Sequence, residues 1–195
     1  MTEASLTHIF APLQSHVMTL AKGDYLFHQG DAAVSFFYVT TGKIKLIRET
    51  IEGGQVLMYG ALAGETLAEA SLFSDVYHCA AIADAPSSLM VYQKAELLAH
   101  LESDPRAMMH VLNMFAQQVR DLRSLNEIKN IRSAQARVLA YINYVMNADG
   151  EVHLHTSLKD MAYKIGLTHE TYYRTLKTLE NQGMLIRKNG SIKLL

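Results

Sequence analysis

Short apolar runs alternate with turn residues between roughly residues 20 and 98. The runs are rich in aromatic and β-branched residues, which favour strands. They lie at 25–27, 36–39, 44–47, 56–59 and 88–92, and the glycine-containing turns lie at 29–31, 41–43, 52–54 and 63–65. Glycine turns about ten residues apart are typical of a small antiparallel barrel or sandwich. We therefore predict that this part of the chain is all-β.

A long helix is predicted next, from Pro105 to about Ile131, with Asp104 or Ser103 as its cap. One stripe of this helix is apolar at alternating spacings of four and three residues: Met108, Leu112, Phe115, Val119 and Leu122. Such spacing is the a/d pattern of a two-stranded coiled coil. The stripe is either a dimer seam over residues 106–131 or a face that packs on the chain's own barrel. We favour the seam, because the helix is long for so small a domain.

The last third of the chain has the pattern of a winged helix-turn-helix. After a hinge at 131–133, Ser133 is a cap for a helix that carries Val138, Leu139, Ile142 and Val145, and a short strand is expected at 152–155. Ser157 and Thr168 can cap two further helices separated by Gly166. Gly183 ends the second helix, 168–182, and a hairpin of 184–186 and 191–194 turns at 189–190. The expected inner face of the helix 168–182 consists of Thr171, Leu176 and Leu179.

The second helix of such a motif enters the major groove of DNA with its first residues. The candidate DNA-binding residues are Thr168, His169, Glu170, Tyr172, Tyr173, Arg174 and Lys177. Arginine can donate two hydrogen bonds to guanine and glutamate can accept one from cytosine. Glu170 would hold Arg174 rigid while each reads a base; the alternative is an ordinary solvated ion pair. The tyrosines and Lys177 contact phosphates or simply cover the domain surface.

Charge and composition support this interpretation. The last 40 residues carry seven Lys or Arg against three Asp or Glu, whereas residues 1–100 carry five against ten. A basic C-terminal segment suits attraction to phosphate. The single cysteine excludes an intrachain disulfide and an iron–sulfur cluster of four cysteines. With no apolar run long enough for a membrane span and no secretory signal, we expect a cytoplasmic protein without membrane contact.

The order of these parts resembles the cyclic-AMP receptor protein / fumarate-nitrate regulator family of bacterial transcription factors. Four blocks carry the resemblance: KGDYLFHQGD at 22–31, FYVTTGKI at 37–44, GETLAEASLF at 64–73 and DMAYKIGLTHETYYRTL at 160–176. The first three lie in the predicted all-β part and the fourth in the predicted helix-turn-helix. Each block alone is modest evidence for the family, but all four in this order are specific evidence.

The resemblance implies an α+β fold with a jelly-roll-like, cyclic-nucleotide-binding-type β-roll, a long dimerisation helix and a C-terminal winged helix-turn-helix. The corresponding domains are 1–103, 104–131 and 132–195. It implies a homodimer that regulates transcription by reading a palindromic site in double-stranded DNA, with RNA polymerase as a candidate partner. The family's Glu-and-Arg reading pair matches Glu170 and Arg174, while His169 departs from the commoner residue before the glutamate.

The resemblance also outlines an effector pocket, with departures from the cyclic-AMP-binding members. Its candidate residues are Gly64, Glu65, Glu69, His78, Cys79, Leu122 and Arg123. Ala68 replaces the family's second glycine, and His78-Cys79 stands where an Arg-Ser pair would hold the cyclic nucleotide's phosphate. Without that arginine a phosphodiester lacks its main charge-assisted partner. We therefore expect no cofactor and a regulator that does not respond to cyclic AMP.

The sequence offers little support for a metal site, a haem site or an enzymatic function. His78 and Cys79 are adjacent, so on a strand they point to opposite faces and reach one metal only from irregular backbone. His153 and His155 share a strand face, but no third ligand can be assigned. The alternative function is a haem or small-ligand gas or redox sensor of the same fold. No Gly-rich phosphate loop, metal triad or Ser/His/Asp arrangement suggests an enzyme.

Overall fold

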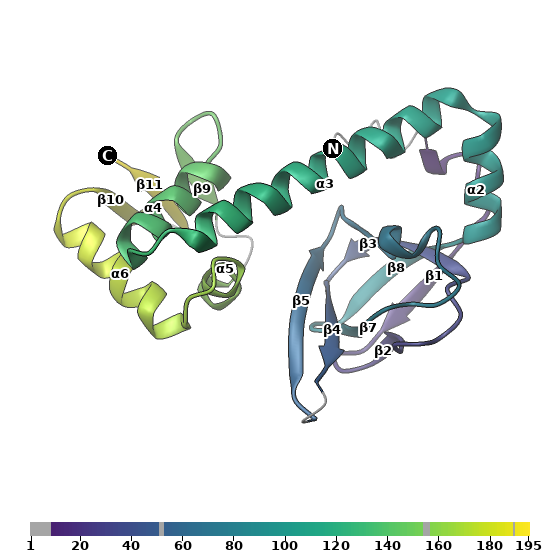
Figure 1. The fold of residues 1–195 in the computed structure, drawn as a ribbon, viewed down its shortest axis with the longest axis horizontal. Helices are drawn as coiled ribbons and strands as arrows, with labels where there is room; N and C mark the ends of the chain where they lie inside the picture. The colour runs from purple at the N-terminus through teal and green to yellow at the C-terminus, as the bar shows by residue number, and fades with distance from the viewer. Residues whose placement is uncertain (1–8, 51–52, 154–156, 189) are drawn as a thin grey trace. The chain divides into compact units, whose positions relative to one another are not determined.

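The computed structural model describes residues 9–50, 53–153, 157–188 and 190–195. The chain forms two compact units, residues 1–113 and residues 114–195 (Figure 1). Because the division lies within the long helix, each unit holds part of it. The three-part division at 103/104 and 131/132 remains a prediction.

The first unit contains two four-stranded sheets, and all strand pairs are antiparallel (Figure 1). One sheet has the order β1 (Ser15–Leu20), β8 (Ser87–Gln93), β3 (Ser35–Thr41), β6 (Thr66–Leu67). The other has the order β2 (Tyr25–Phe27), β7 (Ala80–Ala83), β4 (Lys43–Glu49), β5 (Gln55–Leu62). Each of the five predicted apolar runs lies within a strand, and the α+β fold class is confirmed. Strands β1, β6 and β7 were not predicted.

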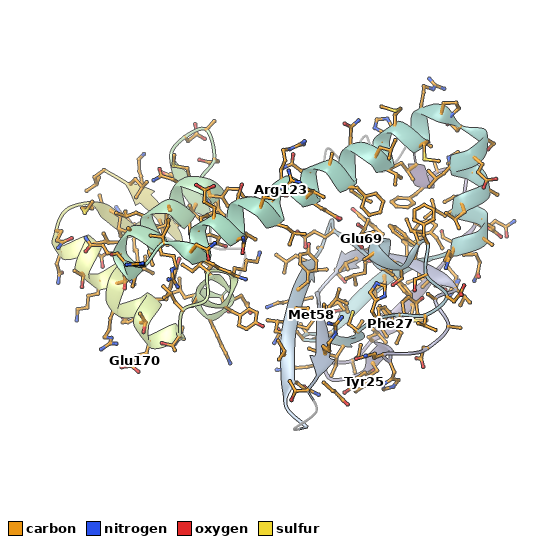
Figure 2. All side chains as sticks on the ribbon, viewed as in Figure 1. Tyr25, Phe27, Met58, Glu69, Arg123 and Glu170 are labelled. Carbon is orange, nitrogen blue, oxygen red and sulfur yellow. The ribbon has the colours of Figure 1, made fainter. Side chains whose placement is uncertain are left out.

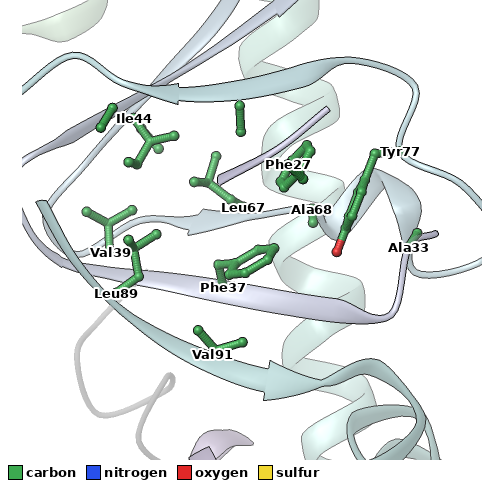
Figure 3. Packing of buried hydrophobic residues seen from close by; sticks show 13 residues of the cluster. Phe27, Ala33, Phe37, Val39, Ile44, Leu67, Ala68, Tyr77, Leu89 and Val91 are labelled. Carbon is green, nitrogen blue, oxygen red and sulfur yellow. The ribbon is translucent and has the colours of Figure 1, made fainter. Parts of the chain in front are cut away.

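The core of this unit lies between the two sheets, where the strands alternate buried and solvated side chains. Phe37, Val39 and Leu89 from one sheet face Ile44 from the other, and all four are buried (Figure 3). The turn at Gly42 shows why glycine is needed: its φ is +88°, and a Cβ there would overlap Ser87 and the Pro86 carbonyl.

Two helices follow the sheets, α2 (Lys94–Ser103) and α3 (Pro105–Asn130). Helix α2 was not predicted, whereas α3 agrees closely with the expected helix. Asp104 Oδ1 accepts hydrogen bonds from the backbone N–H groups of Arg106 and Ala107, at 2.9 and 3.4 Å. Asp104, rather than Ser103, is therefore the cap.

Helix α3 carries two neighbouring apolar stripes. Ala107, Val111, Met114 and Ile128 are buried within the chain. The predicted seam residues lie one position further along, about 100° around the helix. Three of them are exposed, namely Leu112, Val119 and Leu122, with 52%, 45% and 68% of their surface accessible. The chain itself thus covers the first stripe and leaves the second largely open.

The second unit contains α4 (Ala134–Val145), α5 (Leu158–Lys164), α6 (His169–Asn181) and a sheet in the order β10 (Leu185–Lys188), β11 (Ser191–Leu194), β9 (Glu151–His153). The helix break at 131–133 and the Ser133 cap are as predicted. The expected strand at 152–155 is seen as β9; its residues 154 and 155, and turn residue 189, lie outside the described residues. No helix among the described residues is both long and apolar enough to span a membrane.

Candidate nucleic-acid interface

Local sequence signals fix the start of α6. Gly166, with φ +67°, ends the preceding helix, and Thr168 Oγ1 accepts a hydrogen bond from the Thr171 N–H at 3.1 Å. Helix α5 begins in the same way, because Ser157 Oγ accepts from the Asp160 N–H at 3.1 Å. These caps satisfy N–H groups that a helix start leaves unpaired, so both helix starts are well defined. The helix-turn-helix prediction is confirmed.

One face of α6 is exposed and carries most of the predicted reading residues. His169, Glu170, Tyr173, Arg174 and Lys177 are exposed, and so is the cap Thr168. The Glu170 side chain projects outward from α6 (Figure 2). A strip of two cations, a carboxylate and two rings is therefore available to a partner.

The Glu170–Arg174 ion pair is loose. Arg174 Nε lies 4.0 Å from Glu170 Oε1, and the side chains are 70% and 81% exposed, respectively. A solvated pair at this distance contributes little to stability. In the free protein the pair is thus the solvated ion pair of the alternative interpretation, and a rigid pair during base reading stays a prediction.

The structure corrects the position of Tyr172. Its side chain is fully buried, and its hydroxyl lies 3.9 Å from the Met161 sulfur. Burial raises the pKa of this phenol well above its ordinary value. Tyr172 therefore neither contacts phosphate nor covers the surface. With Thr175, Leu176 and Leu179, it forms the inner face of α6 in place of the expected Thr171.

A cluster that we call the wing clamp joins α6 to β10, and the sequence did not reveal it. It consists of Tyr173, Glu180 and Arg187. Arg187 Nη2 and Nε donate to Glu180 Oε2 at 2.6 and 3.2 Å, and the Arg187 N–H donates to Glu180 Oε1 at 3.3 Å. The guanidinium carbon of Arg187 lies 5.3 Å from the centre of the Tyr173 ring. Only the opposite charges seven residues apart, across the Gly183 turn, could have suggested this pairing.

Arg137 of α4 connects the hinge to the turn before α6. Its Nε and Nη2 donate to the Ile131 carbonyl at 2.9 and 2.6 Å, and its Nη1 lies 3.3 Å from the carbonyl oxygens of Ile165 and Gly166. These carbonyls follow the ends of α3 and α5, where helices leave acceptors unpaired. One guanidinium thus holds the hinge and the helix-turn-helix turn together.

Three effector-pocket candidates, Gly64, Glu65 and Glu69, lie close together along the chain in the first unit. Gly64 has φ +90° in the turn after β5. Glu65 Oε2 accepts hydrogen bonds from the Leu62 N–H at 2.8 Å and the Tyr59 hydroxyl at 3.2 Å. Glu69 begins the short helix η1 (Glu69–Ser71) and is partly buried. Ala68, just before it, has φ +69°, a backbone conformation that suits the glycine it replaces.

His78 and Cys79 do not converge on one ligand. His78 is exposed and Cys79 is buried, but both lie in the bend before β7 and not on a strand, so the expected strand alternation does not apply to them. Burial raises the pKa of the Cys79 thiol, so it is mainly the neutral thiol at pH 7. The nearby cation, Arg48, donates from Nη2 to the His78 carbonyl at 3.2 Å. Among the described residues no group of three or more His, Cys, Asp or Glu could hold a metal ion.

The other two pocket candidates, Leu122 and Arg123, lie in the second unit as exposed residues of α3. Arg123 is labelled on this helix in Figure 2. A cavity of 260 Å³ in the first unit has other walls, among them Phe27, Phe37 and Tyr77. None of the seven pocket candidates lines that cavity.

Comparisons with known proteins identify both parts of the chain. Residues 17–104 match the cyclic nucleotide-binding domain, and residues 136–195 match the Crp-like helix-turn-helix domain. The nitrogen fixation regulation protein FixK of Bradyrhizobium diazoefficiens is 25% identical over 182 residues, covering 90% of this chain and 76% of that protein. The cyclic AMP receptor protein of Thermus thermophilus is 26% identical over 181 residues, covering 89% and 81%.

Solved structures agree in fold. FixK2 from Bradyrhizobium japonicum superimposes with a TM-score of 0.72 at 21% identity, covering 93% of each chain. The relatives are transcription regulators and not enzymes. Both matched domains occur in the predicted order, with the long helix between them. The chain therefore belongs to the cyclic-AMP receptor protein / fumarate-nitrate regulator family of transcription regulators.

Proposed function

We propose that this regulator acts in the cytoplasm as a homodimer that reads a palindromic DNA site through α6 and does not require cyclic AMP. The observation that carries the proposal is the exposed reading face of α6, with Glu170 and Arg174 one turn apart and loosely paired. Arginine at this place suits guanine and glutamate suits the cytosine amino group. Thr168, His169, Tyr173 and Lys177 supply the surrounding contacts to bases and phosphates.

The dimer is supported by the open stripe of α3. Leu112, Val119 and Leu122 are large apolar side chains on one helix face, and each is about half exposed or more. A second copy of the same helix would bury this stripe along an a/d seam. Two-fold symmetry would then present two α6 helices about 34 Å apart on one side of the duplex, which calls for a palindromic site.

Independence from cyclic AMP is supported by the residues at the expected phosphate position. His78 is exposed, Cys79 is a buried neutral thiol, and Arg48 is engaged with the His78 carbonyl. A phosphodiester is held best by a guanidinium that makes two charge-assisted hydrogen bonds to it. The core that positions α6 consists of side chains of this chain between residues 125 and 194, which supports a reading face that forms without a cofactor.

The test is a titration of the full-length protein against a randomised duplex library at two salt concentrations, without added effector. Recovery of a two-fold symmetric site is the expected result. Arg174→Ala should then weaken binding to that site by about 1–3 kcal/mol and leave the dimer intact. Arg132→Ala, at an exposed position off the reading helix, is the matched control.

Other outcomes contradict the proposal. Unchanged binding by Arg174→Ala removes that residue from the reading set. Sequence-indifferent, strongly salt-dependent binding by the wild type means that an effector is required. The haem or small-ligand sensor then becomes the better hypothesis, and absorption spectra and thermal-shift screens with haem would test it.

A further inference from the structure

The wing clamp restrains one side chain on the reading face. Arg187 is held by three hydrogen bonds to Glu180, two from its guanidinium and one from its backbone N–H. Its side chain is 23% exposed and that of Glu180 is 33% exposed, so solvent screens this pair less than it screens Glu170 and Arg174. The Glu180 carboxylate thereby fixes a cation beside the ring of Tyr173.

The Tyr173 ring has two neighbours. The Arg187 guanidinium carbon is 5.3 Å from its centre, within the range of a cation–π contact. The His169 ring lies 6.5 Å away, tilted by 39°. Tyr173 nevertheless remains 46% exposed. A large ring that is already ordered in the free protein loses little side-chain entropy when it binds a partner.

The position of Tyr173 on α6 places it among the charged readers. It is three residues after Glu170 and immediately before Arg174, on the side of the helix that faces the wing. Base edges in the major groove offer hydrogen-bond donors and acceptors, and one apolar group, the thymine 5-methyl. The carbon surface of the Tyr173 ring complements that methyl group, and only its hydroxyl could match the donors and acceptors.

We propose that Tyr173 is a specificity-determining residue that contacts a thymine methyl in each half-site, and that Glu180 and Arg187 are positioning residues for its ring. The inference rests on the proposed function, since it requires that α6 reads DNA. The inference gives the wing a part in DNA reading, because Arg187 of β10 then affects which base is preferred although it does not contact that base. The competing role for Tyr173 is a hydrogen bond from its hydroxyl to a backbone phosphate.

The experiment uses the full-length protein and the symmetric duplex recovered from the library. Each thymine of the half-site is replaced in turn by uracil, which removes the methyl group and leaves base pairing unchanged. We expect the wild type to lose about fivefold in affinity at one thymine, the effect of one buried methyl group. Tyr173→Ala should bind the thymine duplex about fivefold more weakly and no longer distinguish it from the uracil duplex.

Three further variants separate the roles. Tyr173→Phe should keep the preference for thymine, because it lacks only the hydroxyl. Arg187→Gln should lower the preference while circular dichroism remains that of the folded protein. Lys177→Ala, an exposed cation on the same face, should weaken both duplexes equally and reduce the salt dependence of binding.

The outcomes distinguish this inference from the proposed function. If the wild type recovers a symmetric site but tolerates uracil at every position, the role of Tyr173 is refuted and DNA reading by α6 stands. A thymine preference retained by Tyr173→Ala refutes it equally. If Tyr173→Phe behaves like Tyr173→Ala, the hydroxyl carries the contact, and the methyl assignment is wrong. If no site is recovered, both proposals fail.

Discussion

Replacement of Arg137 by methionine should destabilise the second unit, because one guanidinium serves three backbone carbonyls there. The contacts to the Ile131 carbonyl are short, 2.9 and 2.6 Å, whereas those to Ile165 and Gly166 are both 3.3 Å. Hydrogen bonds to a charged group contribute about 1.5–3 kcal/mol, and longer ones contribute less. Methionine keeps the aliphatic stem and removes only the donors, so we expect a loss of about 2–3 kcal/mol in the free energy of unfolding.

Urea unfolding followed by far-ultraviolet circular dichroism measures this loss. The matched control is Arg132→Met, which removes an exposed arginine five residues earlier. Surface substitutions away from specific contacts usually change stability by less than about 0.5 kcal/mol. If the two variants unfold at the same urea concentration, water replaces the guanidinium at these carbonyls without cost, and the connecting role of Arg137 is refuted.

Three further predictions concern separate features. Ala68→Gly should raise the free energy of unfolding by about 0.5–1 kcal/mol. The backbone strain that alanine has at φ +69° is larger than the stability that glycine loses through its greater freedom in the unfolded chain. An unchanged thermal midpoint would contradict this. Leu122→Glu should yield a folded monomer by light scattering, since Leu122 is 68% exposed; a persistent dimer would exclude this face as the seam. Hydrogen bonds from Arg187 lower the pKa of Glu180 in the folded protein. The stability that this ion pair contributes is therefore fully present above the ordinary carboxyl pKa of about 4.3, and it is lost as the pH falls through the lowered pKa of the folded state. The stability difference between wild type and Glu180→Gln should therefore shrink in acid; a difference independent of pH would refute the pairing.

Much of the fold could be predicted from local signals. The caps Asp104, Ser133, Ser157 and Thr168 and the stop at Gly166 are residue types whose chemistry acts within a few positions of the chain. They therefore gave helix boundaries close to those observed. Strands β1 and β7 escaped prediction because neither combines aromatic or β-branched enrichment with clear turns on both sides; β7 is largely alanine.

The candidate site could be predicted only in part. Glu170 and Arg174 were found because their spacing is local to one helix. Tyr172 was misplaced because a tyrosine has an apolar body and a polar tip, and only the packing of α6 on the rest of its unit decides which of these dominates. The contacts of Arg137 join segments that are far apart in the sequence, and the wing clamp joins a helix to a strand. The hydrophobic periodicity of a single helix or strand contains no signal for such contacts.

The two stripes of α3 have a consequence for how the occupancy of a DNA site depends on the concentration of the protein. Ala107, Val111 and Met114 contribute to the core of a single chain, whereas Leu112 and Val119 are free to meet a second copy. Folding of one chain and pairing with a second copy would therefore not compete for the same side chains. If the proposed homodimer forms along the second stripe, occupancy of a two-fold site follows the square of the monomer concentration while monomers predominate. A modest change in the rate of synthesis would then shift the occupancy of such a site sharply.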